Sequence, residues 1–160
     1  MNLLINLPQN LNNLQREAIA LDVIQFIIDR TKSGVDINNE PFADYKQSYK
    51  DTFEYKIGHG GNADVNLTLT GEMLGTITLL SHGVGYIKLG FSDAEAAKKA
   101  KWISSPTGQK AGKQKPRKFF GITDKDLNKI INRHKNNDVA FQTTATSSLA
   151  ANVVRKILGL

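Results

Sequence analysis

The histidines are the first side chains to consider for metal chemistry. His59, His82 and His134 are widely separated, and none has a second possible ligand at the spacing that one helix or one hairpin would bring together. The chain has no cysteine, which excludes disulfides, thiolate metal sites and a cysteine nucleophile. We therefore expect no metal site and no metal cofactor.

One loop has acidic and amide side chains at the alternate positions of a calcium site. Asp36, Asn38 and Glu40 have the spacing of the first ligands, but Pro41 replaces the required glycine and Gln47 stands where a bidentate glutamate belongs. An aspartate in a turn commonly accepts hydrogen bonds from the backbone that follows it. The sequence therefore favours an Asx turn over a calcium site.

Residues 108–113 (GQKAGK) have the composition of a phosphate-binding loop. Three residues separate the glycines where four are needed, Gln114 follows in place of Ser or Thr, and no strand is predicted before the loop. A flexible basic loop is the better interpretation. The sequence also has no nucleophile elbow and no carboxylate pair flanking a cleft-like loop. We expect a protein without catalytic residues, not an enzyme.

Basic residues are concentrated in one part of the chain, and this is the clearest chemical signal. Residues 98–135 contain 12 of the 21 Lys and Arg and two acidic residues, a net charge of +10, whereas the rest of the chain has a net charge of −4. Such an asymmetry describes binding partners rather than fold. The candidate contacts to nucleic-acid phosphates or to an acidic protein surface are Lys110, Lys113, Lys115, Arg117 and Lys118.

The elements that position these residues belong to one α+β domain. The 160 residues, 40% of them apolar, suffice for one domain with its own core. Residues 11–32 carry apolar side chains at spacings of three and four and are followed by Gly34, which predicts a long N-terminal helix. Its apolar face is broad enough to contact both a sheet and something else. Residues 35–50 are expected to form a loop and a short helix, with Tyr45 and Tyr49 on one face.

Between residues 53 and 91 the apolar period changes to two. Alternation predicts half-buried strands at residues 53–57, 65–69, 77–79 and 87–91. Because the turn-like separators are short, we expect a small antiparallel β-meander on which the long helix packs. Residues 71–75 fit either a turn or one turn of helix.

Two further helices are predicted nearer the C-terminus. Ser92 as the N-cap and Glu95 three residues later form a capping box for a helix over residues 93–101. Thr123 caps a helix over residues 124–135, which has acidic residues at its start and basic residues at its end, as the helix dipole favours.

The remaining segments are assigned by composition. Residues 104–118 are rich in Gly, Pro and Lys and are expected to be mobile in the monomer. Phe119 and Phe120 follow as candidate structural anchors, and we expect at least one to be buried against the long helix. Residues 1–135 thus form the domain, and residues 136–160 a polar linker and a C-terminal assembly helix. The candidate subunit-interface residues of that helix are Leu149, Val153, Ile157 and Leu160.

No apolar run is typical of a signal peptide or a membrane span. The apolar run over residues 3–7 is too short for a signal sequence and lacks a basic segment before it. We expect a soluble protein made in a cytoplasm, with no membrane partner.

Several segments occur in an order that resembles the phage virion morphogenesis or tail-completion family, whose members are head–tail connector (neck) proteins. After the long helix come residues 30–34 (RTKSG) with Asp36, 41–50 (PFADYKQSYK), 69–77 (LTGEMLGTI), the Ala-rich 94–101 and 116–121 (PRKFFG). The resemblance covers residues 16–135. Residues 101–103 (KWI) depart from the family pattern, which tends to have Tyr-Ala followed by His.

The resemblance implies a structural virion protein, a neck or tail-completion subunit that forms a homo-oligomeric ring joining the head of a tailed bacteriophage to its tail. It implies a location in the virion, and in the host cytoplasm during assembly. The implied partners are further copies of the chain and portal, adaptor or tail proteins, with packaged DNA as another contact of the basic loop. It implies no catalytic residues and no cofactor.

The charge distribution alone supports a different function, that of a stand-alone basic nucleic-acid-binding protein. Such a protein would bind DNA as an isolated monomer, with an affinity that falls steeply in salt. A third class, a phage nuclease or other enzyme, would show metal-dependent turnover.

Overall fold

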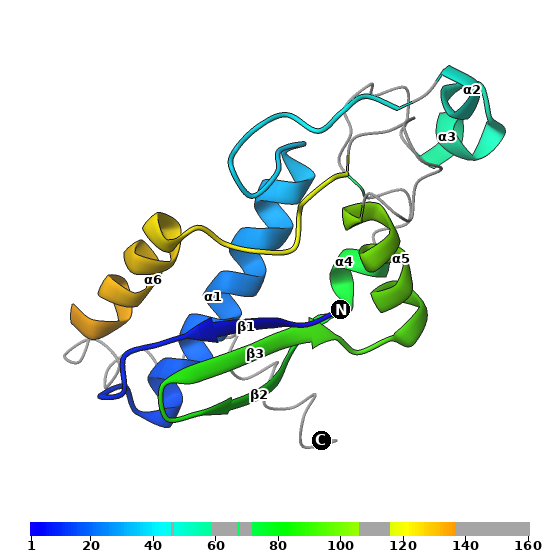
Figure 1. The fold of residues 1–160 in the computed structure, drawn as a ribbon. Helices are drawn as coiled ribbons and strands as arrows, with labels where there is room; N and C mark the ends of the chain where they lie inside the picture. Colours follow the sequence, from blue (N-terminus) through cyan, green and yellow to red (C-terminus); the bar gives the residue numbers. More distant parts are fainter. Residues whose placement is uncertain (46, 59–66, 68–71, 106–115, 137–160) are drawn as a thin grey trace.

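The computed structural model describes residues 1–45, 47–58, 67, 72–105 and 116–136. Within these ranges the fold is α+β, as predicted, with a long N-terminal helix, a three-stranded antiparallel sheet and further helices nearer the C-terminus (Figure 1). The elements in chain order are β1 (Leu3–Asn6), α1 (Asn13–Lys32), α2 (Gln47–Lys50), α3 (Phe53–Gly58), α4 (Glu72–Gly75), β2 (Ile77–Gly83), β3 (Tyr86–Phe91), α5 (Ala94–Ser104) and α6 (Asp124–Asn136).

The sheet has the strand order β1-β3-β2, and both pairs are antiparallel. The hairpin of β2 and β3 was predicted from the sequence, but the third strand is β1, from the N-terminus, which was not. Ile5 of β1 lies opposite Ile87 of β3, and Leu79 of β2 lies opposite Leu89. Ile5, Ile87 and Leu89 are all buried, so one face of the sheet supplies part of the core.

The helix α1 lies between the sheet and α6, and packs on β2 and β3 as well as on α6. Asn12 is its N-cap, and the amide and side chain of Gln15 complete a reciprocal capping box with it at 2.8 and 2.9 Å. The helix ends before Gly34, which takes the left-handed conformation (φ +80°) that favours glycine. The fully buried apolar residues of its inner face are Ile19, Ala20, Val23 and Ile27.

The predicted strand at residues 53–57 is wrong, because this segment is the helix α3. The Thr52 hydroxyl oxygen accepts a hydrogen bond from the Tyr55 amide at 3.3 Å, in the manner of an N-cap. Phe53 and Ile57, four residues apart, are both exposed. Of the predicted strand at residues 65–69, Leu67 is described, with a left-handed φ of +55°, and the other residues lie outside the described ranges.

The predicted N-cap is correct for α6 and wrong for α5. The N-cap of α5 is Asp93 rather than Ser92, and its carboxylate accepts a hydrogen bond from the Ala96 amide at 2.6 Å. Thr123 caps α6 as predicted, through a 3.2 Å hydrogen bond from the Asp126 amide. Of residues 71–75, which fit either a turn or one turn of helix, residues 72–75 form the helix α4, and residue 71 lies outside the described ranges.

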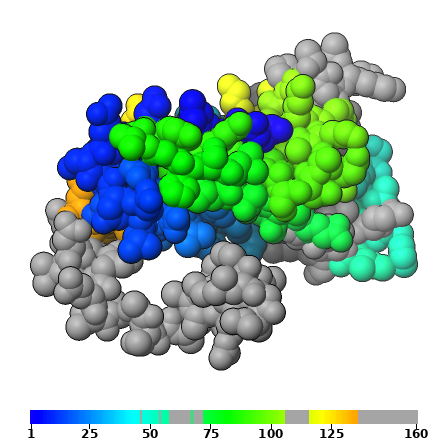
Figure 2. Space-filling view, turned by 90° about the horizontal axis from the view of Figure 1, so that it is seen from below, coloured from blue at the N-terminus to red at the C-terminus, as the bar shows by residue number. Residues whose placement is uncertain are grey.

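The outer side of the sheet is partly uncovered. In the space-filling view, the β2–β3 hairpin (green) lies at the surface between N-terminal residues (blue) and α5 (yellow-green) (Figure 2). Several large apolar side chains on or beside these strands are exposed. They are Leu4, Leu80, Val84 and Tyr86.

Candidate functional site: the arginine junction

The loop after α1 folds back on itself through backbone hydrogen bonds. The Gly34 carbonyl accepts a hydrogen bond from the Phe42 amide at 2.8 Å. The Asp36 carboxylate accepts hydrogen bonds from the amides of Asn38, at 2.7 Å, and Glu40, at 3.1 Å. This arrangement is the predicted Asx turn, and it commits one oxygen of the Asp36 carboxylate to the backbone.

Arg30, in the last turn of α1, joins this helix to the segment that precedes α6. Its Nη2 donates to the carbonyl oxygens of Phe119, at 2.5 Å, and Gly121, at 2.9 Å. Beside this contact the Ile37 amide donates to the Lys118 carbonyl at 2.9 Å. A Cβ on Gly121 would approach the Ile37 side chain to 3.2 Å, so the close approach favours glycine.

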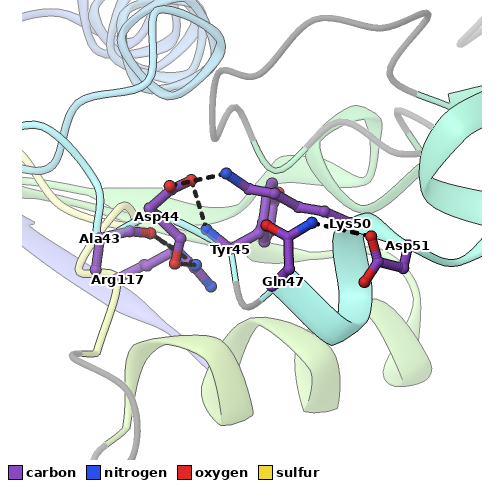
Figure 3. Close-up of polar contacts among 7 residues, drawn as sticks. All are labelled: Ala43, Asp44, Tyr45, Gln47, Lys50, Asp51 and Arg117. Atoms are coloured by element: carbon purple, nitrogen blue, oxygen red, sulfur yellow. Dashed lines mark hydrogen bonds and ion pairs between the residues drawn. The ribbon is translucent and has the colours of Figure 1, made fainter.

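Arg117 makes the reciprocal contact, from the later segment back to the loop. Its Nη2 donates to the Ala43 carbonyl at 2.7 Å and to the Asp44 carbonyl at 3.3 Å, and its Nε donates to Ala43 at 3.2 Å (Figure 3). The guanidinium also lies over the Tyr45 ring, 4.8 Å from its centroid. We call the two arginines and the backbone carbonyls they bind the arginine junction.

Both arginines of the junction are 6% exposed. Burial lowers the pKa of each guanidinium, but from a usual value so high that both remain protonated. A buried charge is tolerated where hydrogen-bond acceptors lie beside it. Backbone carbonyls fill that role for Arg117 and for Nη2 of Arg30, whereas Nε and Nη1 of Arg30 are buried without a hydrogen-bond partner among the described residues. The junction therefore fixes two distant chain segments against each other by charged hydrogen bonds.

Beyond the junction lies a small unit that we call the lobe, made of Tyr45, α2 and α3. The rings of Tyr45, Tyr49 and Tyr55 form a triangle with centroid separations of 5.1, 5.4 and 5.6 Å. Lys50 reaches back to the Asp44 carboxylate at 2.8 Å, which lowers the pKa of Asp44 (Figure 3). Burial raises the pKa of the Tyr45 hydroxyl.

The two histidines in the described ranges each contact a carboxylate. His82 pairs with Glu17 at 3.2 Å and His134 with Asp22 at 2.9 Å, each a contact with a single carboxylate. Within the described ranges no three His, Cys, Asp or Glu side chains are grouped to hold a metal ion. His59 and the GQKAGK loop lie outside those ranges. The polar groups of the junction bind backbone carbonyls of the same chain.

The basic candidate contacts separate into three groups. Arg117 must be removed from the set, because its guanidinium is buried on carbonyls of its own chain and is not available to a phosphate. Lys118 is exposed, as a contact to a partner requires. The others, Lys110, Lys113 and Lys115, lie outside the described residues.

The two candidate anchors, Phe119 and Phe120, are both buried, with 0% and 8% of their surface exposed. The Phe119 carbonyl is held by Arg30 of α1, and the Phe120 ring lies 4.9 Å from that of Phe91 in β3. The candidate subunit-interface residues lie outside the described ranges. They are Leu149, Val153, Ile157 and Leu160.

Sequence reasoning did not single out Arg30, although a signal was present. Arg30 continues the row of Ile19, Val23 and Ile27 on the buried face of α1. An arginine in line with an apolar helix face needs buried acceptors. That signal was sufficient to suggest an internal contact.

No protein-family model, no curated protein and no solved structure matches this chain. In the part of the chain that the structure describes, no helix is both long and apolar enough to cross a membrane.

Proposed function

We propose that this chain is a structural subunit of the neck or tail-completion region of a tailed bacteriophage, where it forms a homo-oligomeric ring that joins head to tail. The observation that carries the proposal is the arginine junction. Three of the segments that resemble the tail-completion family meet there: residues 30–34 and 41–50, which are neighbours in sequence, and residues 116–121, which are distant from both. A shared motif order is expected when its segments build one structural unit.

The surface of the molecule supports contacts with neighbouring proteins. Leu14 and Leu21 of α1 are 70% and 53% exposed, so this helix carries a second apolar side away from the sheet. Leu4, Val84 and Tyr86 line a hollow of about 600 Å³ at the end of the sheet. Exposed apolar side chains gathered in this way are typical of surfaces that bind other proteins.

In this proposal the chain is not an enzyme and needs no cofactor. Its partners are further copies of itself and the portal, adaptor or tail proteins of the virion. It is located in the neck or tail region of the virion, and in the host cytoplasm during assembly. The C-terminal residues 147–160 pack across the subunit boundary and hold the ring together.

Sedimentation velocity of the full chain and of a variant lacking residues 147–160 tests this proposal. We expect oligomers for the full chain. The variant should be a monomer whose circular dichroism spectrum still shows the helices of residues 1–136. V153D is a sharper probe, because it places a charge on the predicted interface stripe. N152D introduces the same charge one position away and should leave assembly intact.

Two results would count against the proposal. Unfolding of the truncated protein would make residues 147–160 part of the core, and normal assembly of both V153D and the truncated protein would make them dispensable. A full chain that stays monomeric and binds DNA in that state would favour the stand-alone nucleic-acid-binding function instead.

A further inference from the structure

The helix α5 has one buried side and one exposed side with a distinctive composition. Ala96 and Ala100 are buried on the side that packs against β3 and α4. Lys98, Lys99 and Trp102 are exposed, at spacings of three and four that place them together on the helix surface. Trp102 is 55% exposed, which leaves a large aromatic face open beside two cations.

The charge on this side of α5 is basic. Glu95, the one acidic residue within the helix, is paired with Lys98 at 2.6 Å. Both side chains are exposed and a surface pair of this kind contributes little, so a phosphate can replace the Glu95 carboxylate on Lys98. Lys99 and Lys101 are exposed near the end of the helix. The Arg117 amide donates to the Ile103 carbonyl at 3.0 Å, and this bond brings the exposed Lys118 to the same end.

We infer that the exposed side of α5 binds single-stranded nucleic acid, with Trp102 stacked on a base and Lys98 and Lys99 contacting the phosphates on either side. An exposed aromatic ring next to cations is the arrangement used for sequence-tolerant binding of single strands. The base must be unstacked to reach the indole, which favours a single strand over a duplex. An acidic protein would pair with the lysines but leave the indole unused.

This site goes beyond the proposed function, because ring formation does not require it. Buried Arg117 takes no part in it, and the lysines of residues 106–115 are not needed to define it. A negative result for ring formation therefore leaves the α5 site untouched, and a negative result at the α5 site leaves ring formation untouched.

The sequence provides a direct reporter, because Trp102 is the one tryptophan in the chain. A 20-nucleotide oligothymidylate titrated into the full chain should quench the tryptophan fluorescence to saturation, more strongly than the same length of duplex. Polyglutamate of equal charge tests the acidic-protein alternative. Quenching by polyglutamate equal to that by oligothymidylate, or no quenching by either, would overturn the inference.

Variants separate stacking from charge when binding is followed by anisotropy of a labelled oligothymidylate. We expect W102A to weaken binding about tenfold. K98Q/K99Q should lower the slope of log affinity against log salt by about 1.4. K125Q/K135Q removes two exposed lysines from α6 and serves as the matched control. Equal losses in the α5 and α6 double variants, or full binding by W102A, would show non-specific attraction and contradict the site.

Discussion

The body and the lobe of this molecule are held together by different forces. The body, made of the sheet with α1, α5 and α6, has an aliphatic core in which residues such as Ile19, Ile27 and Leu89 are fully buried. In the lobe, Tyr55 is buried but lies outside that core, and the main contact of α2 is with α3. The lobe relies instead on tyrosine rings, of which Tyr45 packs against that core, and on the hydrogen bonds of Arg117.

Because of this difference, we expect the lobe to open locally while the body stays folded. In the body, many buried aliphatic side chains each add to the free energy of unfolding. A single charged hydrogen bond contributes about 1.5–3 kcal/mol, so the attachment of the lobe depends on a few contacts. The lobe also exposes Phe53 and Ile57 on one side of α3, at 73% and 66%. A unit with a local attachment and an apolar outer side is suited to a role in assembly, while the body supplies rigidity.

The largest effect is expected from the core of the body. Phe119 is fully buried, and F119A should lower the free energy of unfolding by about 3–5 kcal/mol, because it leaves a cavity. Urea denaturation followed by circular dichroism measures the change. F53A removes an equally large ring from the exposed side of α3 and should change stability by less than about 0.5 kcal/mol. Similar losses in both variants would contradict the division into body and lobe.

The next effect is expected at the junction. R117A removes the charged hydrogen bonds to Ala43 and Asp44 and should cost about 1.5–3 kcal/mol. Because the contact attaches the lobe, hydrogen exchange should speed up in α2 and α3 and stay slow in α1 and β3. Arg117→Lys keeps the charge but loses the planar fork, and should restore little of the protection. Loss of protection throughout α1 would mean that Arg117 supports the body.

A smaller effect is expected within the tyrosine triangle. Tyr49 lies 5.1 Å from the Tyr45 ring and 5.4 Å from the Tyr55 ring. Tyr49→Leu keeps an apolar side chain but removes the aromatic pairs, and should cost about 0.5–1.5 kcal/mol, confined to the lobe. Tyr86→Leu, at a partly exposed ring of the body, is the comparison. Exchange rates in α3 that are the same in both variants would exclude a role for ring contacts in holding the lobe.

The smallest effect is expected in the stability at acidic pH and comes from the Asp44–Lys50 pair. The hydrogen bond from Lys50 lowers the pKa of Asp44 below its usual 3.8, so the folded state binds this proton less readily than the unfolded state. The contribution of Asp44 to the free energy of unfolding is therefore fully present above the pKa that it has in the unfolded state. It is lost as the pH falls through the lower pKa of the folded state. Carbon-detected NMR titration of the Asp44 carboxyl gives the value directly. In K50Q the pKa should return towards 3.8, and an unchanged low value would contradict the assigned cause.

Periodic helices were the part of the fold that the sequence predicted well. The apolar rows of α1, the cap at Thr123 and the stop at Gly34 are local signals, and each is present in the structure. The strand β1 was missed because it has four residues, too few to establish an alternation. Its pairing with β3 depends on contacts between distant parts of the chain, which a local pattern does not contain.

The error at α3 has a specific cause. The alternation of Phe53, Tyr55 and Ile57 has the period of a strand, but only Tyr55 is buried. The Tyr55 ring packs on the rings of Tyr45 and Tyr49 rather than in a sheet, and Thr52 caps the helix. The junction was partly predictable: Phe119 and Phe120 were recognised as anchors, whereas Arg117 was assigned outward because its neighbours are lysines.

The most direct test of the proposed role is the size of the assembly, measured by size-exclusion chromatography with multi-angle light scattering. The full chain is examined alone, and mixed with the portal protein or the tail-tube protein of the same phage. The proposal predicts a fixed multiple of the 17.6 kDa chain that elutes together with one of these partners. A mass of 17.6 kDa at every concentration and in every mixture would contradict it.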